Sequence, residues 1–474
     1  MNIVQLYSIS GEKIDPAKIE SFELKLKGNL IRPGNSDYEK ARKIWNGMID
    51  KYPAIIARCV NVRDVVACVQ FAKENDIRVA VKAGGHNVAG NSISDGGLVI
   101  DLSGMKNVIV DVEKKTVIAE AGLTLNELDK ETQEYNFAVP AGVISTTGIA
   151  GLTLGGGFGW LARKHGLTCD NLISAEIVDA SAKIVMASAE QNSELFWGIR
   201  GGGGNFGIVT SFKFQLYPIS EVLGGPIFFE GSKRREVFKF YRDYIKTVPD
   251  ELSTLFISPT APPAPFLPES IHGKPLVGID VCYEGDIKEG EKYLKPLRNF
   301  LKPVVDLIQP MPYLARQSSN DPMEPPGFQI YWKSLYFDEF SDEAINQIDT
   351  YCNSVTSPLS NLVIHQLGGA IKDIGENETA YTYRSANYIL IIASKWVNAA
   401  ENDLHIHWTR QFWEALKPYS SAATYINFLG NEGDDAVKLA YGEANYSRLV
   451  ELKNKYDPTN FFKNNQNIKP KNRI

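Results

Sequence analysis

The sequence predicts an α+β protein with two main domains and a C-terminal segment. Strand-like and helix-like stretches alternate over residues 1–220 of the 474-residue chain, a pattern typical of a mixed α+β domain. Over residues 221–425, proline clusters such as PTAPPAPFLP alternate with aromatic stretches such as QIYWKSLYF. That change predicts a mostly antiparallel sheet covered by helices. Residues 426–474 form the third part.

The first domain is expected to open with a capped helix and a strand. Asn61 is a favourable N-cap for VRDVVACVQFAKEN, in which valines recur at helical spacing. RVAVKA at 78–83 follows as a strand that leads into the glycine-rich loop GGHNVAG. The stretch therefore predicts helix, strand and loop in that order.

Further strands and helices follow in the first domain. GLVIDLS predicts one strand, and NVIVDV with TVIAEAG predicts a hairpin or two neighbouring strands. Thr124 and Glu127 form a capping-box signature for TLNELDKETQEYN. After the glycine-dense stretch 142–166 come strand-like AEIVDASAKIVMAS, a short helix ELFWGIR, and the strand of GGGGNFGIVTSFKF.

The second domain combines aromatic strands with amphipathic helices. QIYWKSLYF and NYILIIASKW predict strands, and DLHIHWTRQFWEAL predicts a helix. Near the C-terminus, YSRLVELKNKYDPTNFF predicts an amphipathic helix that ends at Asp-Pro.

Composition indicates an ordinary globular chain with small uncharged partners. The chain is 44% hydrophobic and 22% charged, with a formal net charge of -6 and no basic stripe for nucleic acid or an anionic membrane. No apolar run approaches the ~18 residues of a membrane span, so we expect a cytoplasmic protein. The expected oligomeric state is a monomer or a homodimer. The cysteines predict neither disulfides nor a zinc site, because they are odd in number and lack C-x-x-C spacing: Cys59, Cys68, Cys169, Cys282 and Cys352.

The sequence contains three glycine clusters, in which backbone without side chains can approach a ligand or another loop closely. GGGGNFG contains a G-x-G-x-x-G match at 202–207, but it follows a helix and precedes a strand, the reverse of the dinucleotide fingerprint. AGGHNVAG and GLTLGGGFGW favour phosphate binding, because free amides in a tight turn form an anion-binding concavity. The role of His86 inside the first of these loops needs a separate explanation.

The clusters together with their surroundings resemble a known family. RVAVKAGGHNVAG, PAGVISTTGIAGLTLGGGFGWLARKHGLTCDNLISAEIVDA, ELFWGIRGGGGNFGIVTSFKF and the tail KYDPTNFFKNNQNIKP resemble the bacterial and archaeal berberine-bridge-enzyme-like flavoproteins. These belong to the vanillyl-alcohol-oxidase superfamily. The resemblance implies a PCMH-type FAD-binding domain of two α+β subdomains, a substrate domain with an antiparallel sheet covered by helices, and a C-terminal segment that returns to the FAD domain.

The resemblance also implies FAD held by two covalent bonds. His86 matches the histidine bonded to the flavin 8α-methyl, and Cys169 matches the cysteine that forms a thioether at C6. Imidazole and thiolate are suitable nucleophiles for an electron-poor ring. Lys82 and Ala83 depart from the family's usual Arg and Gly or Ser, and Lys82 would offer a point charge to pyrophosphate. The remaining residues expected along FAD are Gly84, Gly85, Asn87, Val88, Gly142, Thr146, Gly148, Gly151, Gly155, Ile208, Val209, Asn465 and Asn467.

Related microbial enzymes use a tyrosine near the C-terminus as catalytic base. Tyr425, with Asn427 beside it in TYINF, is the expected base, and Tyr446 is the second candidate. A tyrosine has an ordinary pKa near 10, so the base needs a partner that favours the phenolate. The sequence offers Tyr383, Arg384 and Lys395 as candidates for that partner, without excluding others.

Other residues carry weaker expectations. Tyr331, Trp332 or Tyr388 could stack on a ring-shaped substrate, since the resemblance places the second sheet over the flavin. His405 and His407 form an H-x-H pair, but residues two apart on a helix do not share a face, so no metal site is expected. By resemblance Leu167 lies beside the flavin and is expected to slow the approach of oxygen.

These observations predict an FAD-dependent oxidoreductase that acts on small molecules. The expected reaction converts an alcohol or lactol of a sugar, glycoside or polycyclic metabolite to a ketone or lactone, with electrons passing to O2 or another acceptor. One alternative keeps the flavin but performs oxidative cyclisation or dehydrogenation of a secondary metabolite. The other alternative is a redox-silent binding protein that retains the fold.

Overall fold

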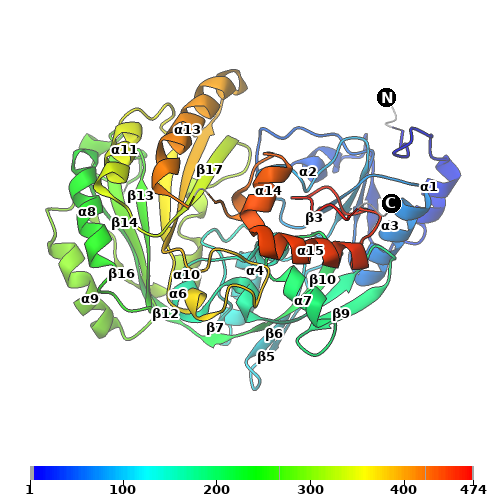
Figure 1. Cartoon of the computed structure of the whole chain (residues 1–474), viewed down its shortest axis with the longest axis horizontal. Coiled ribbons are helices and arrows are strands. Elements are labelled where there is room, and N and C mark those ends of the chain that lie inside the picture. Colours follow the sequence, from blue (N-terminus) through cyan, green and yellow to red (C-terminus); the bar gives the residue numbers. More distant parts are fainter. Residues whose placement is uncertain (1–4, 266, 422, 472–474) are drawn as a thin grey trace.

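Three main sheets and one short two-stranded sheet, residues 137–138 with 217–218, are present in the described residues. A large antiparallel sheet makes up one side of the molecule (Figure 1). The computed structural model describes residues 5–471, apart from 266 and 422. The first part of the chain builds two smaller sheets, and the third sheet begins at Glu221.

The first sheet has four strands in the order β1-β2-β4-β3. Its strands are β1 (Asn29–Ile31), β2 (Ile55–Arg58), β3 (Val79–Lys82) and β4 (Leu98–Asp101). β2, β4 and β3 are parallel, and helix α3 (Val62–Glu74) connects β2 to β3. The predicted cap is confirmed, because the Asn61 side chain accepts from the amides of Arg63 and Asp64. This sheet delivers the loop that carries His86 from the end of β3.

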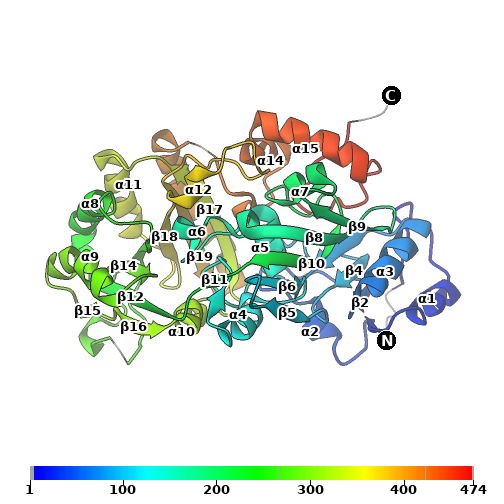
Figure 2. The ribbon, with the colours of Figure 1, turned by 90° about the horizontal axis from the view of Figure 1, so that it is seen from below.

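The second sheet is antiparallel, in the order β5-β6-β10-β8-β9, and crosses the centre of the view in Figure 2. Its strands are β5 (Val108–Asp111), β6 (Thr116–Glu120), β8 (Leu172–Val178), β9 (Ile184–Ser188) and β10 (Ile208–Gln215). The predicted hairpin is confirmed by the β5–β6 pairing. The G-x-G-x-x-G match does lie between a helix, α7 (Ser193–Ile199), and the strand β10, so its context is not that of a dinucleotide fingerprint.

Helices of the first part follow local signals with one exception. The predicted capping box at Thr124 and Glu127 is present at the start of α4 (Leu125–Gln133). The exception is the glycine-dense stretch 142–166, which we did not expect to be helical but which contains α5 (Ile149–Gly155) and α6 (Ala162–His165). Burial of Ile149, Ala150 and Thr153 in the core outweighs the weak helix propensity of the glycines.

The third sheet runs β15-β12-β14-β13-β18-β19-β17, with β16 paired to β12. Its strands are β12 (Glu221–Glu230), β13 (Leu252–Ser258), β14 (Leu276–Tyr283), β15 (Val305–Asp306), β16 (Gln309–Pro312), β17 (Gln329–Phe337), β18 (Asn361–Gln366) and β19 (Tyr388–Trp396). Four helices cover its outer face (Figure 1): α8 (Arg234–Tyr244), α9 (Ile287–Asn299), α11 (Asp342–Cys352) and α13 (Asn402–Leu416). The inner face is therefore left toward the first part of the chain.

The remaining elements are short connections and a C-terminal helix pair. They are α1 (Pro16–Glu23), α2 (Tyr38–Arg42), β7 (Phe137–Ala138), η1 (Thr168–Asn171), β11 (Tyr217–Pro218), η2 (Gly231–Lys233), η3 (Glu269–Ile271), α10 (Tyr313–Ser318), η4 (Asp321–Met323), α12 (Ala370–Asp373), η5 (Ala399–Glu401), η6 (Lys417–Tyr419), η7 (Ile426–Phe428), α14 (Asp434–Tyr441) and α15 (Glu443–Tyr456). α15 lies beside α7 in Figures 1 and 2. A fully buried Lys453–Asp457 pair of 2.7 Å anchors α15, and Lys453 also donates to the carbonyl of Asn205.

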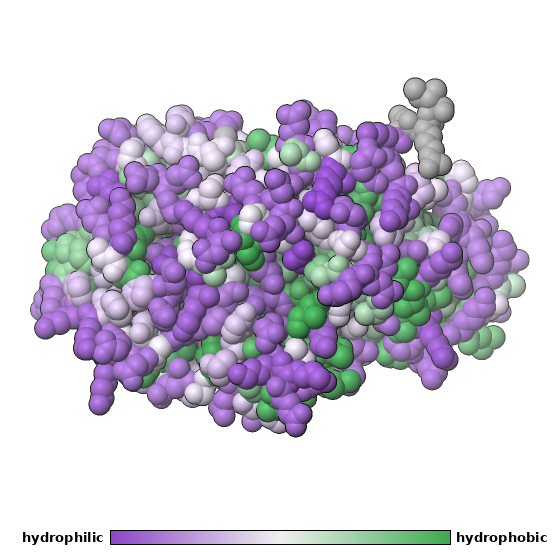
Figure 3. Space-filling view, turned by 60° about the horizontal axis from the view of Figure 1, so that its bottom comes forward, coloured by the Kyte–Doolittle hydropathy of each residue, from purple (hydrophilic) through white to green (hydrophobic). Residues whose placement is uncertain are grey.

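The surface and the cysteines agree with a globular chain. The face shown in Figure 3 is mostly hydrophilic, with hydrophobic residues scattered across it. Within residues 5–471 without 266 and 422, no helix has the length and apolar character needed to cross a bilayer. All five cysteines are buried and free.

Candidate active site

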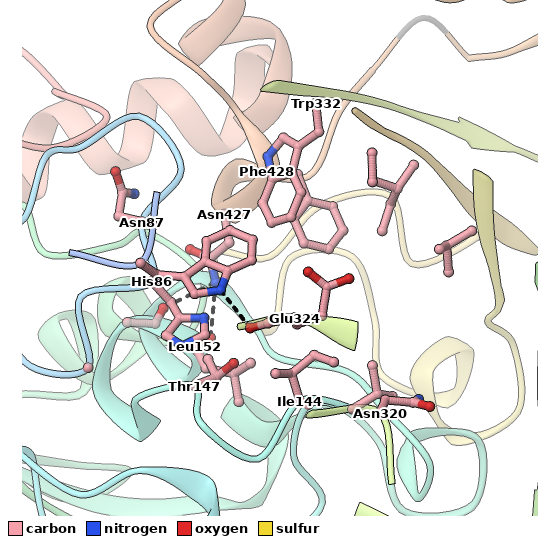
Figure 4. Close-up of a pocket in the computed structure, with 18 of the residues that line it drawn as sticks. His86, Asn87, Ile144, Thr147, Leu152, Asn320, Glu324, Trp332, Asn427 and Phe428 are labelled. Carbon is pink, nitrogen blue, oxygen red and sulfur yellow. Dashed lines mark hydrogen bonds between the residues drawn. The ribbon is translucent and has the colours of Figure 1, made fainter. Parts of the chain in front are cut away.

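One large cavity of about 1140 Å³ lies between the first part of the chain and the inner face of the third sheet. Its wall combines the glycine loops of the first part, side chains from β13, β18, β19 and β17, and the segments 425–428 and 464–466. Figure 4 shows Trp332 and Phe428 together on one side, with His86, Thr147 and Ile144 on the opposite side. Most residues singled out from the sequence meet around this cavity.

Two glycines lock the first two loops together. A Cβ added to Gly84 would lie 2.4 Å from the backbone nitrogen of Gly148, and one added to Gly148 would lie 2.5 Å from that of Gly84. Both positions exclude a side chain, since such distances are far inside van der Waals contact. The loops that begin at Ala83 and Thr147 therefore approach each other backbone to backbone and form one wall of the cavity.

The third loop and the C-terminal segment form a second stretch of wall. Ile208, Val209 and Gly204 line the cavity together with Asn464 and Asn465. The Asn465 amide donates to the Gly204 carbonyl over 3.1 Å.

His86 presents a neutral imidazole on the cavity wall. Its ring stacks on Trp45 with centroids 5.1 Å apart, and its Nε2 lies 3.2 Å from the Thr146 hydroxyl. Burial lowers the pKa of His86 to about 4, so the ring keeps a free lone pair at neutral pH. Such a ring can act as a nucleophile or hydrogen-bonding group toward a ligand in the cavity.

Tyr425 lines the same cavity and its hydroxyl oxygen accepts two hydrogen bonds. The amide of Gly157 donates over 2.8 Å and the side-chain amide of Asn427 over 2.9 Å. Burial raises the pKa of Tyr425, and both donors oppose that rise. In the described part of the chain no acceptor takes the proton of this hydroxyl, which makes the group suited to exchange a proton with a ligand.

A glycine makes room for Asn427. A Cβ at Gly155 would lie 2.2 Å from the Asn427 Oδ1 atom. Asn427 also donates to the carbonyls of Gly151 and Leu152, contacts drawn as dashed lines in Figure 4. The end of α5 therefore fixes the amide that points at Tyr425.

The candidates for a phenolate partner were wrong. Arg384 pairs with Asp170 and Lys395 pairs with Glu324. The hydroxyl of Tyr383 donates to the carbonyl of Leu439. The second candidate base, Tyr446, lies on α15 and is not part of the cavity wall. The backbone amide of Gly157 and the side chain of Asn427, the residue expected beside Tyr425, take the place of these side chains.

Cys169 lies behind the wall. Its side chain is fully buried, its Sγ lies 3.6 Å from Asp170 Oδ1, and its amide donates to the carbonyl of Gly156. Burial and the neighbouring Asp170 raise the pKa of the thiol. Cys169 thus packs directly against the loop whose Gly157 amide donates to Tyr425, and its thiol faces the Asp170 carboxylate.

Several other expected residues also lie off the wall. Lys82 donates to the carbonyl of Ala41 over 2.7 Å, and Val88 packs with Trp45 in a small apolar cluster. Leu167 is completely buried and its carbonyl accepts from Asn171, so its position gives no support to a steric gate for oxygen. Thr146, Gly155 and Asn467 do not contribute to the lining either, although Thr146 contacts His86.

Strand alternation decides which aromatic residues face the cavity. Trp332 lines it, whereas Tyr388 packs in the outer core. Tyr331, which alternates with Trp332 along β17, accepts a hydrogen bond from Arg410 on α13. The sequence did not single out Trp45, Phe158, Phe428 and His365, all of which line the cavity. Only the sheet register and the loop packing bring them there.

The H-x-H pair splits between the two faces of its helix. His405 is buried and its Nδ1 lies 2.8 Å from the Thr356 hydroxyl, whereas His407 is exposed. No group of three or more His, Cys, Asp or Glu among the described residues is arranged to hold a metal ion.

The wall fits a dinucleotide cofactor. A Cβ at Gly151 or Gly204 would meet no atom within 4 Å, so bare backbone opens onto the cavity at both positions. Asn465 Oδ1 is buried with no partner in the part of the chain that the structure describes. Backbone amides and an unpaired amide oxygen are groups that phosphates, hydroxyls and ring nitrogens can satisfy.

Comparison with known proteins agrees with this geometry. A family model described as an FAD binding domain matches residues 53–188, and one described as berberine and berberine like matches residues 424–469. The first match covers the loop of His86 together with Cys169, and the second covers Tyr425 and Asn465.

Full-length relatives show the same similarity. An FAD-linked oxidoreductase of Dictyostelium discoideum is 34% identical over 459 residues, covering 95% of this chain and 97% of that protein. The (R)-6-hydroxynicotine oxidase of Paenarthrobacter nicotinovorans is 28% identical, covering 94% of this chain and 98% of its own. The crystal structure of 6-hydroxy-D-nicotine oxidase from Arthrobacter nicotinovorans matches with a TM-score of 0.85 at 26% identity, covering 94% of this chain and 99% of that one.

Proposed function

The chain belongs to the berberine-bridge-enzyme-like family of FAD-linked oxidoreductases, and on that premise we propose that it oxidises an alcohol or lactol to a ketone or lactone. The substrate is a sugar, a glycoside or a polycyclic metabolite, and the electrons pass to O2, giving H2O2, or to another acceptor. Bound FAD supplies the two-electron acceptor for the hydride that leaves the C–H bond.

The observation that carries this proposal is the pair of donors on Tyr425. Oxidation of an alcohol releases a hydride from carbon and a proton from oxygen, and the proton needs a base on the cavity wall. The Gly157 amide and the Asn427 side chain both stabilise negative charge on the Tyr425 oxygen. We assign the proton to Tyr425 in its phenolate form, which these two donors favour against the burial that raises the pKa of the tyrosine, and Asn427 positions its oxygen.

His86 and Cys169 hold the cofactor through covalent bonds. The neutral imidazole of His86 on the cavity wall supports the first bond. For the second bond, the thiol of Cys169 would have to turn from Asp170 toward the cavity and lose its proton, because the thiolate is the nucleophile. The C–S bond would replace a ring C–H bond, and the two electrons released would pass to O2 or the other acceptor. Expected residues on the cavity wall, such as Gly84, Gly151 and Asn465, would contact the cofactor. Lys82 and Thr146 instead support the loops that surround it.

An anaerobic substrate screen tests the proposal. Purified protein is mixed with alcohols, lactols and sugars, and loss of the visible flavin absorbance is followed. A compound that bleaches the flavin and yields the matching ketone or lactone supports the proposal. Failure of every alcohol and lactol to bleach a flavin that dithionite still reduces would reject it.

A further inference from the structure

His365 is a buried polar side chain on the cavity wall that no protein group satisfies. It lies on β18 with only 6% of its surface exposed and lines the cavity. Its strand neighbours are Leu255 on β13 and Ile389 on β19, and its ring meets Phe158 edge-on at 5.0 Å. No residue that the structure describes forms a hydrogen bond with its imidazole.

Two polar side chains at the start of β18 already have partners. Ser360 accepts from the amide of Lys395, and Asn361 accepts from the amide of Ser258. Burial lowers the pKa of His365 to about 3. The imidazole is therefore neutral, with one N–H donor and one acceptor that no described residue occupies and that border the cavity.

The sheet surface around His365 is apolar. The lining residues from β13, β18, β19 and the edge strand β17 are mostly aliphatic or aromatic, and include Leu255, Ile257, Trp332, Val363, Ile391 and Ala393. A polyhydroxylated sugar laid on these side chains would lose water from its hydroxyl groups without gaining hydrogen bonds. Apolar rings gain by burial on the same surface.

The formal charges of the wall are compensated. Asp280 pairs with Arg316 at 2.7 Å, and Lys395 pairs with Glu324 at 2.7 Å. Asp280, Glu324 and Lys395 are the three formally charged side chains among the described lining residues. An ionised substrate would thus lack a free counter-charge on this wall.

We propose that His365 determines specificity by binding a hydroxyl or carbonyl group at the far end of an uncharged, mostly apolar, ring-containing alcohol. This inference rests on the proposed function and selects one of its substrate classes over sugars. Phe158 contacts both His365 and Tyr425, with ring centroids 5.0 and 5.1 Å away. One small molecule can therefore span from the group that His365 holds to the carbon that reacts near Tyr425.

The test uses two probe pairs that differ by one distal hydroxyl. They are cinnamyl alcohol with 4-hydroxycinnamyl alcohol, and 1-(2-naphthyl)ethanol with its 6-hydroxy derivative; cellobiose represents the sugars. Dissociation constants are measured by anaerobic calorimetry on the dithionite-reduced holoenzyme, which cannot oxidise the alcohols, and flavin bleaching is recorded separately on the oxidised holoenzyme. The variants are His365→Leu, His365→Asn, which keeps a neutral donor and acceptor, and His405→Leu, a buried histidine away from the cavity.

We expect at least one hydroxylated probe to bind the wild type about tenfold more tightly than its partner, the usual effect of one hydrogen bond. His365→Leu removes this preference, His365→Asn restores part of it, and His405→Leu leaves it unchanged. Any one of three results would overturn the inference. The preference could survive in His365→Leu, cellobiose could bind more tightly than every aromatic alcohol, or no aromatic alcohol could bind. Bleaching by cellobiose alone would leave the proposed function standing. The opposite result is also informative: the aromatic alcohols could bind with the His365 preference while no alcohol or lactol of the wider screen bleaches the flavin. That result would reject the proposed function and leave the role of His365 in binding standing.

Discussion

The side-chain amide of Asn427 donates a hydrogen bond to the hydroxyl oxygen of Tyr425 over 2.9 Å. The two residues are neighbours on one short segment, and Gly155 leaves the space that the Asn427 side chain occupies. The Gly157 amide adds a second donor to the same oxygen. Together these donors offset part of the effect of burial, which raises the pKa of Tyr425.

Removing one donor is expected to shift the pH dependence of catalysis. Asn427→Ala destabilises the phenolate, so the pKa of Tyr425 rises and the ascending limb of the rate profile moves to higher pH by about one to two units. Stopped-flow reduction of the flavin as a function of pH measures this shift. A lower rate with an unmoved limb would restrict Asn427 to a structural role.

The covalent bonds to FAD can be counted by mass. After acid denaturation, the wild type is expected to keep one FAD per chain, and His86→Ala and Cys169→Ala are each expected to keep it through the remaining bond. The double variant releases the cofactor, and Cys282→Ala, another buried thiol, behaves as the wild type. Release of all FAD from the denatured wild type would contradict both bonds. Complete release from His86→Ala alone would leave a single bond at His86.

His365 is expected to make stability depend on acid pH. The unfolded chain protonates this histidine below about pH 6.5, whereas the folded imidazole stays neutral down to about 3. Stability therefore falls as pH falls within that window, by up to about 1.4 kcal/mol per pH unit from this group. Urea unfolding should show a smaller loss between about pH 6.5 and 4.5 for His365→Leu than for the wild type. His407→Leu, at an exposed site, is the control, and equal slopes for wild type and His365→Leu would contradict the assignment.

The Arg384–Asp170 ion pair is expected to be a strong structural contact. Both side chains are nearly inaccessible, at 1% and 2% exposure, and two hydrogen bonds of 2.6 and 3.0 Å join them. Arg384→Met leaves the carboxylate buried without its partner, which costs about 3–5 kcal/mol of unfolding free energy. Arg448→Met, which breaks an exposed pair with Glu194, should cost at most about 1 kcal/mol. Similar losses of unfolding free energy in the two variants would show that the buried pair stabilises the fold no more than the exposed pair does.

Local signals in the sequence predicted local structure well. The Asn61 cap, the Thr124 capping box and the β5–β6 hairpin need only residues close together in the chain. The loop of His86 was recognisable for the same reason, since a strand leads directly into its glycines.

Contacts between distant segments could not be predicted in this way. The role of His365 depends on the pairing of β18 with β13 and β19 and on the approach of Phe158 from a loop some two hundred residues earlier. The partners of Tyr425 are a backbone amide and a neighbouring side chain, whereas residue type alone had favoured Arg384 and Lys395. Both of those are neutralised by carboxylates elsewhere in the fold.

The most direct test of the account is the anaerobic reduction of the Tyr425→Phe variant by a substrate found in the screen. We expect an unchanged flavin spectrum, retained covalent FAD and a reductive rate lower by roughly 10² to 10⁴, the usual consequence of losing a general base. A reductive rate equal to that of the wild type would show that Tyr425 does not take the proton and would contradict the proposed mechanism.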